Sequence, residues 1–210
     1  MIVWIDLCII SAGVIAIHEC WRPQSMKIMN IVWPINALWG GPAILLLYFI
    51  IGQHKMDHHM KMETMDSKPD HRLHFQSVAK ATLHCGAGCT LADILSMIIK
   101  EIFSLSQGVN FVIAYILAFI FGIYFQYIAQ REMDSNTTSG ELLKKSVITD
   151  FWSLFAWQLG MLITQLVLTP HFANTLDSAV VVMQLAMLVG FFFAYPVNYW
   201  LILKGIKKAM

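Results

Sequence analysis

Six apolar stretches, each long enough to cross a lipid bilayer as a helix, account for most of this 210-residue chain. A helix needs about 20 predominantly apolar residues to span the hydrocarbon core. The stretches cover residues 2–20, 28–51, 77–103, 109–130, 146–169 and 179–203. Because a helix satisfies its own backbone hydrogen bonds in lipid, we expect an all-α integral membrane protein built as a six-helix transmembrane bundle.

The composition agrees with a membrane protein and excludes other classes. Hydrophobic residues make up 58% of the chain and charged residues only 13%, whereas soluble domains are about 25% charged. The net charge of +1 leaves no basic surface to neutralise phosphates, so nucleic acid is excluded as a partner and the lipid bilayer is the expected surrounding. We divide the chain into two N-terminal transmembrane helices in residues 1–52, a cytoplasmic His/Met-rich loop in residues 53–76 and a four-helix transmembrane core in residues 77–210.

The basic residues predict the orientation of the helices, because lysine and arginine accumulate in the short cytoplasmic loops of membrane proteins. With both termini in the cytoplasm, the cytoplasmic segments hold eleven basic residues and the outer segments only three, which are Arg22, Lys27 and Lys100. We therefore predict that both termini and the loop of residues 53–76 are cytoplasmic. The connection from His18 to Met29 should then face the other side.

The third apolar stretch carries the residues that most suggest a functional site. Cys85, Cys89 and Asp93 recur every four residues, so at about 100° per residue they share one face of the helix. Two thiolates one turn apart, with the imidazole of His84 at the edge of this face, form a soft ligand set suited to copper or zinc. Asp93 adds a harder oxygen, and a carboxylate so deep in an apolar span is expected to be buried with a partner.

Two other interpretations of Cys85 and Cys89 stay open. Cysteine is a common small residue in membrane helices, so the pair could serve packing alone. The pair could also be a redox couple, although cysteines at i and i+4 of an unbroken helix have poor geometry for a disulfide. We rank metal ligation first. Asp93 and Asp150 are the candidates for proton coupling, with Lys80 or His84 as the partner of Asp150.

Two further groups of candidate ligands lie outside this helix. In the loop, histidines are interleaved with methionines, and imidazole and thioether side chains together favour copper. Its candidates for metal capture are His54, Met56, His58, His59, Met60, Met62, Met65, His71 and His74. Near the end of the first span, a small cluster that could take up or release an ion is formed by His18, Cys20 and Met26. The alternatives are a solvated linker for the loop and an ion pair of Glu19 with Arg22 for the cluster.

The segment from His84 to Ile94 reads HCGAGCTLADI. With it the chain resembles a bacterial family of small polytopic membrane proteins that is catalogued as a domain of unknown function and is marked by the motif HCGAGCTL-[GA]-DI. This sequence departs from the family's usual pattern at Ala92, where glycine is usual, and at Met97, where an acidic residue often stands. It implies a multi-pass protein of the bacterial inner membrane and the importance of the two thiols and Asp93, but it implies no activity.

The function we expect from these residues is the binding and translocation of a soft transition-metal ion, copper first, through Cys85, Cys89 and Asp93. The sequence contains no nucleotide-binding motif such as a Walker A segment, so we expect a transporter rather than an enzyme that hydrolyses ATP. A membrane thiol oxidoreductase and a non-transporting metal-insertion or scaffold subunit are the alternatives. Copper or zinc is the expected ion, and a homo-oligomer or a metallochaperone stays open as a partner.

Overall fold

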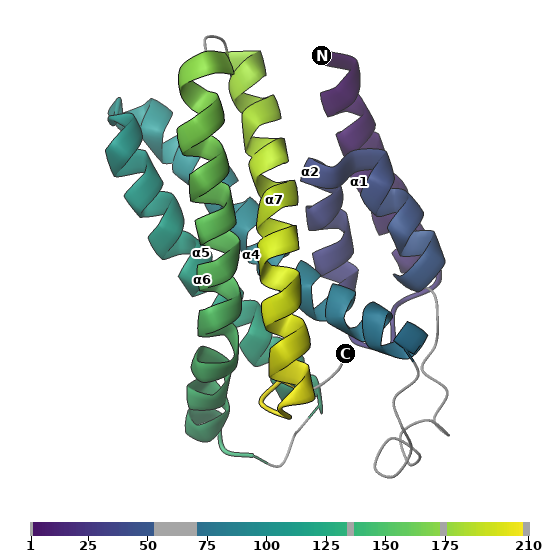
Figure 1. The fold of residues 1–210 in the computed structure, drawn as a ribbon. Coiled ribbons are helices and arrows are strands. Elements are labelled where there is room, and N and C mark those ends of the chain that lie inside the picture. Colours follow the sequence, from purple (N-terminus) through teal and green to yellow (C-terminus); the bar gives the residue numbers. More distant parts are fainter. Residues whose placement is uncertain (1, 53–70, 134–136, 173–175, 208–210) are drawn as a thin grey trace.

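The described part of the chain in the computed structural model is built from helices (Figure 1). It comprises residues 2–52, 71–133, 137–172 and 176–207. The helices are α1 (Ile2–Trp21), α2 (Met29–Leu47) continued by the π-helical turn η1 (Tyr48–Gly52), α4 (His71–Phe103), α5 (Gln107–Met133), α6 (Ser139–Phe172) and α7 (Leu176–Leu203). Six segments are long and apolar enough to cross a membrane, which confirms the expected all-α membrane fold.

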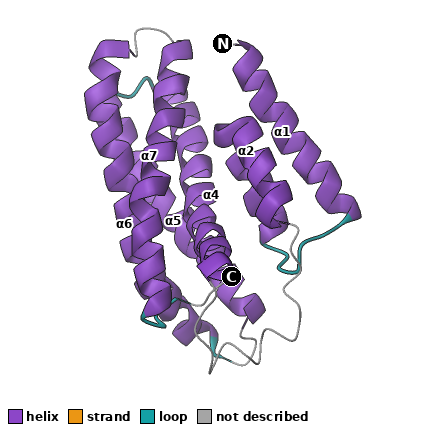
Figure 2. Cartoon of the chain, turned by 45° about the vertical axis from the view of Figure 1, so that its right-hand side comes forward, coloured by secondary structure: helices purple, strands orange, loops and turns teal. Residues whose placement is uncertain are grey.

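Helix α4 lies at the centre of the molecule. It contacts α5, α6 and α7 on one side and α2 on the other. Figure 2 shows α1 and α2 as a pair beside the group formed by α4 to α7. Because α4 touches most of the other helices, its polar side chains are the ones best placed to meet partners from elsewhere in the chain.

Glycines bring the helices of this group close together, as small residues commonly do in membrane proteins. At Gly88 of α4, an added Cβ atom would lie only 2.7 Å from the backbone nitrogen of Gly122 in α5. At Gly160 of α6, it would lie 3.0 Å from the Cα atom of Gly190 in α7. The two helix pairs therefore pack backbone against backbone, which leaves no room for a side chain at these positions.

The second apolar segment reverses its direction instead of crossing the bundle. Gly41 has φ 51° and ψ −131°, a backbone conformation that glycine adopts far more readily than other residues. Trp33 and Tyr48 lie on either side of it, and their ring centroids are 5.5 Å apart. In an unbroken helix these two residues would be separated by about 22 Å. Residues 29–52 therefore form a re-entrant hairpin with its tip at Gly41.

This reversal corrects the prediction that both termini lie on one side. The indole nitrogen of Trp4 donates a hydrogen bond of 2.8 Å to Gln184 Oε1, so α1 begins beside the start of α7. Helix α7 then runs to the opposite end of the bundle (Figure 1). The sequence pattern around Pro34 and Pro42 predicts an interrupted helix, but it does not distinguish a kink from a full reversal.

We call the end where α7 finishes the C-terminal end and the opposite one the N-terminal end. The His18 to Met29 connection, predicted to face away from the C-terminus, lies at the C-terminal end. His18 Nδ1 at the end of α1 is 2.8 Å from the hydroxyl of Tyr48, near the close of the hairpin. The first arm of the hairpin thus begins, and the second arm ends, on the side of the molecule where α4 begins.

The predicted loop of residues 53–76 differs from the structure at its second boundary. Helix α4 begins at His71, so the last part of that range is helical. The side chains of His71 and His74 lie outside the described residues. So do the remaining candidates for metal capture, which are His54, Met56, His58, His59, Met60, Met62 and Met65.

Candidate functional site

The polar face of α4 points into the group formed by α4 to α7, as its periodicity predicts. Cys85 and Cys89 are fully buried, and Asp93 is 8% exposed. Although the three residues share a face, each meets a different set of partners. The face therefore divides into an inner part around Cys85, towards the C-terminal end, and an outer part around Asp93.

Cys85 belongs to a buried hydrogen-bond network with α6. Its thiol donates to Asp150 Oδ1 over 3.3 Å, and its sulfur lies 3.0 Å from the hydroxyl oxygen of Ser153. Asn198 of α7 donates from Nδ2 to the same Ser153 oxygen over 2.5 Å. Three helices are therefore joined through one cysteine, one serine and one asparagine.

Lys207 supplies the positive charge of this network. Its Nζ atom lies 3.0 Å from Asp150 Oδ1 and 2.8 Å from Asn198 Oδ1, and it also donates to the main-chain oxygen of Ala81 over 3.4 Å. The side chain is only 1% exposed. Burial lowers the pKa of Lys207, but the nearby Cys85 and Asp150 raise it by more, so its pKa lies above the ordinary value of 10.5. The ammonium group is therefore charged at neutral pH.

A turn after α7 carries Lys207 back into the bundle. Gly205 has φ 66°, and the backbone nitrogens of Ile206 and Lys207 both donate to the carbonyl oxygen of Leu201. A glycine in this conformation just past a helix is a common way to end it. The sequence predicts Lys80 or His84 as the partner of Asp150, and this prediction is wrong because Lys207 occupies that place.

His84 lies beside the network without joining the thiols. Its Nδ1 atom is 3.2 Å from the carbonyl oxygen of Lys80, and its Nε2 atom has no hydrogen-bond partner. The ring is 1% exposed. This placement agrees with the helix geometry, because His84 is about 100° away from Cys85 around the axis.

Cys89 lies at the boundary between the two parts of the face. Gln158 of α6 donates from Nε2 to the sulfur of Cys89 over 3.5 Å. Gln158 also lines a cavity that extends from this point towards the N-terminal end of the bundle. Cys89 is thus separated from the cavity by one hydrogen-bonded side chain.

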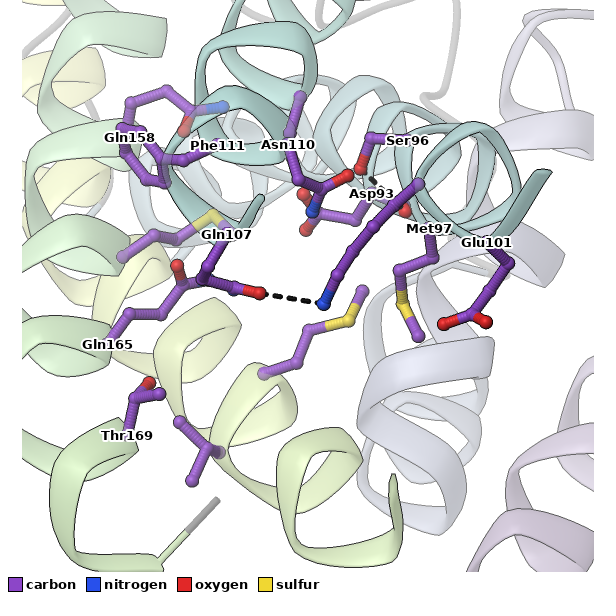
Figure 3. Close-up of a pocket in the computed structure, with 15 residues that line it drawn as sticks. Asp93, Ser96, Met97, Glu101, Gln107, Asn110, Phe111, Gln158, Gln165 and Thr169 are labelled. Atoms are coloured by element: carbon purple, nitrogen blue, oxygen red, sulfur yellow. Dashed lines mark hydrogen bonds between the residues drawn. The ribbon is translucent and has the colours of Figure 1, made fainter. Parts of the chain in front are cut away.

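The cavity has a volume of about 260 Å³ and lies among α4, α5, α6 and α7 (Figure 3). Asp93 and Gln158 line the part nearer the middle of the bundle, and Lys100, Glu101 and Gln107 line the part where α4 ends and α5 begins. Three methionines contribute to its wall, which are Met97, Met161 and Met183. The cavity therefore combines oxygen atoms with thioether sulfur atoms.

The predicted ligands do not come together as one cluster. Among the residues that the structure describes, no group of three or more His, Cys, Asp or Glu side chains could hold a metal ion. On α4, His84, Cys85 and Cys89 each contact a different neighbour. In the other predicted cluster, Cys20 is exposed, Met26 packs against the hydrophobic core and His18 contacts Tyr48.

Some residues of the site are absent from the sequence-based candidates. Met161 reads as core in a helix, and Asn110 and Met183 carry no local signal at all. Met97 stands one turn beyond Asp93, so helical spacing alone could have placed it on the same face. Lys207 could not have been found in this way, because a turn and not a helix determines its position.

The comparison with protein families matches residues 74–207, which include α5, α6, α7 and nearly all of α4. The match therefore covers the whole network and the whole cavity, and it leaves out α1 and α2. No curated protein and no solved structure matches the chain. The chain belongs to the family described as a domain of unknown function, DUF4396, and its candidate site lies entirely within the matched region.

Proposed function

We propose that this protein carries copper(I) across the membrane along the sulfur atoms of the α4 to α7 group. The observation that supports this is the continuity between the cavity and the thiols. Methionine sulfur atoms occur in the cavity wall, and Gln158 links the cavity to Cys89. Cys85 lies one helical turn further, so sulfur donors are available at successive depths.

The choice of copper(I) follows from the ligand types. Thioether and thiolate sulfur atoms are soft donors and select copper(I) over harder ions. Zinc in proteins almost always has four ligands, or three and a water molecule. No cluster of that size occurs among the described His, Cys, Asp and Glu side chains, whereas copper(I) is chemically satisfied by two sulfur atoms. Cys85 and Cys89 would supply such a pair.

The distribution of charge supports an orientation for this route. Eight of the nine basic residues whose side chains are described lie in the half of the molecule at the C-terminal end: Arg22, Lys27, Lys80, Arg131, Lys144, Lys145, Lys204 and Lys207. Only Lys100 lies at the other end. By the positive-inside rule the C-terminal end would be cytoplasmic, in a bacterium on the inner face of the cytoplasmic membrane. The cavity would then face the outside, and the Lys207 network would close the route on the cytoplasmic side.

A transport assay with purified, reconstituted protein tests this function. Proteoliposomes should accumulate copper(I), read by an enclosed chelating dye, faster than empty liposomes and faster than they accumulate zinc. Cys85→Ser and Cys89→Ser keep size and polarity but remove the soft donor, so each should reduce the rate at least about tenfold.

Cys8→Ser is the matched control, because Cys8 is also a buried cysteine but lies in α1 beside Gln184 and away from the cavity. Its rate should equal that of the wild type. Copper(I) transport by Cys85→Ser and Cys89→Ser at the wild-type rate would overturn the proposal. The proposal would also be overturned if thiol counting on the transport-active protein showed that Cys85 and Cys89 form a disulfide.

A further inference from the structure

We propose that the cavity also contains a binding site for a hard monovalent cation, sodium, formed by the carboxylate of Asp93 and the side-chain oxygens of Asn110 and Ser96. This site lies beside the proposed copper route and does not depend on it. It assigns to Asp93 a role with an oxygen-preferring ion, separate from the thiols with which the sequence groups it.

The first supporting observation is that Asp93 is buried without a counter-charge. Its Oδ2 atom has no hydrogen-bond partner, and among the described residues no basic side chain forms an ion pair with it. Lys100, the basic residue that shares the cavity, donates instead to Gln107 Oε1 over 2.8 Å. A carboxylate within the membrane is expected to be paired, so Asp93 lacks the partner that its position requires.

The second observation is an unpaired oxygen on the facing helix. Asn110 of α5 is only 9% exposed, and its Oδ1 atom also has no hydrogen-bond partner. Asp93 and Asn110 line the same cavity, and Figure 3 shows their side chains turned towards one another. Two acceptor oxygens from different helices therefore face one space, and no described donor satisfies either of them.

Ser96 completes the oxygen set. Its hydroxyl hydrogen is used in a bond of 3.0 Å to the carbonyl oxygen of Asp93, so its own oxygen remains available as an acceptor. Ser96 is almost fully buried and lines the cavity as well. Water in a cavity of this size can supply the remaining ligands of an ion.

Charge and ligand type identify the class of ion. One carboxylate and two neutral oxygens carry a single negative charge, which a monovalent cation neutralises. A divalent ion would leave one positive charge uncompensated in a medium of low dielectric constant. Oxygen donors suit hard ions, whereas copper(I) prefers sulfur. Sodium would therefore bind the oxygen atoms of the cavity, and copper(I) its sulfur atoms.

The test uses the full-length protein in detergent, without copper. Radioactive sodium binding should be saturable at about one ion per chain, and sodium chloride should raise the melting temperature more than choline chloride at equal ionic strength. Asp93→Asn should abolish both effects. Asn110→Leu removes one neutral ligand and should weaken the apparent affinity about tenfold or more.

Glu101→Gln is the matched control, because Glu101 is a carboxylate that lines the same cavity but is exposed. It should bind sodium like the wild type. Absence of saturable binding to the wild type would overturn the proposal, and so would an equal loss in Glu101→Gln and Asp93→Asn. If Asp93→Asn does not fold, unaltered binding in Asn110→Leu and in Ser96→Ala would overturn it as well. Because no copper is present, these results leave the copper proposal to its own experiment.

Discussion

The two parts of the polar face of α4 treat buried charge in opposite ways. Around Cys85, the carboxylate of Asp150 is neutralised by Lys207 of the same chain. Around Asp93, no described basic side chain forms an ion pair, and a cavity takes the place of one. A buried carboxylate in a membrane protein is expected to have a partner, and of the two carboxylates that border this face only Asp150 of α6 has one within the described residues.

This difference also distinguishes a closed end from an open one. The side chains around Lys207 are almost fully buried and bridge three helices, whereas the cavity extends to exposed residues such as Glu101 and Gln107. Cys89 and its hydrogen-bond partner Gln158 lie between the two parts.

Lys207→Met should destabilise the protein by about 3–5 kcal/mol, because it leaves the Asp150 carboxylate buried without a partner. The measurement is the free energy of unfolding in detergent micelles. The double variant Asp150→Asn with Lys207→Met removes both charges and should recover most of the loss. Equal stability of the single and double variants would show that the pair is not electrostatically coupled.

Gly88→Leu should cost about 1–3 kcal/mol, because the new side chain would meet the backbone of Gly122 and force α4 and α5 apart. Gly108→Ala is the control, since an added Cβ atom there meets nothing within 4 Å. Thermal unfolding of the two variants in one detergent gives the comparison. A tolerated leucine at position 88 would mean that the two helices are not held together at this point.

Ser153→Ala should cost about 0.5–1.5 kcal/mol, the usual net value of a buried hydrogen bond. It removes the oxygen that accepts from Asn198 and contacts Cys85, while the ion pair of Lys207 with Asp150 remains. The loss should therefore be smaller than that of Lys207→Met in the same unfolding experiment. A loss as large as that of Lys207→Met would show that the neutral hydrogen bonds stabilise the network as much as the ion pair does.

Asp93→Asn should change stability by less than about 1 kcal/mol in sodium-free buffer, since no hydrogen bond or ion pair to its carboxylate is lost. Asp150→Asn, the matched change in the paired part of the face, should be clearly more destabilising because it unpairs Lys207. If the two substitutions lowered the free energy of unfolding equally, Asp93 and Asp150 would not differ in how their charges are compensated.

Much of the fold follows from the sequence by simple physical rules. A long apolar segment in lipid has to be a helix, so the positions of the six segments are predictable from hydropathy. The shared face of Cys85, Cys89 and Asp93 follows equally from the helical repeat. These features depend on local sequence alone, which is why no knowledge of the tertiary structure is needed to obtain them.

The partners of that face are not predictable in the same way. Lys207 reaches Asp150 only because Gly205 turns the chain back after α7, and a glycine outside a helix has no periodic signal. The position of Asp93 and Asn110 in the wall of one cavity depends on how α4 packs on α5. Such relations are set by distance in space, and a single sequence contains no record of them.

The reversal at Gly41 has a consequence for how the chain enters the membrane during synthesis. The tip of the hairpin must be shielded from lipid, because backbone groups at a turn are not fully bonded within the segment. Its neighbours there are Trp4 and Cys8 of α1, and further along the first arm Asn36 donates to the carbonyl oxygen of Leu83 in α4. Because one of these contacts comes from α4, we expect the hairpin to reach its final depth only after α4 has been synthesised.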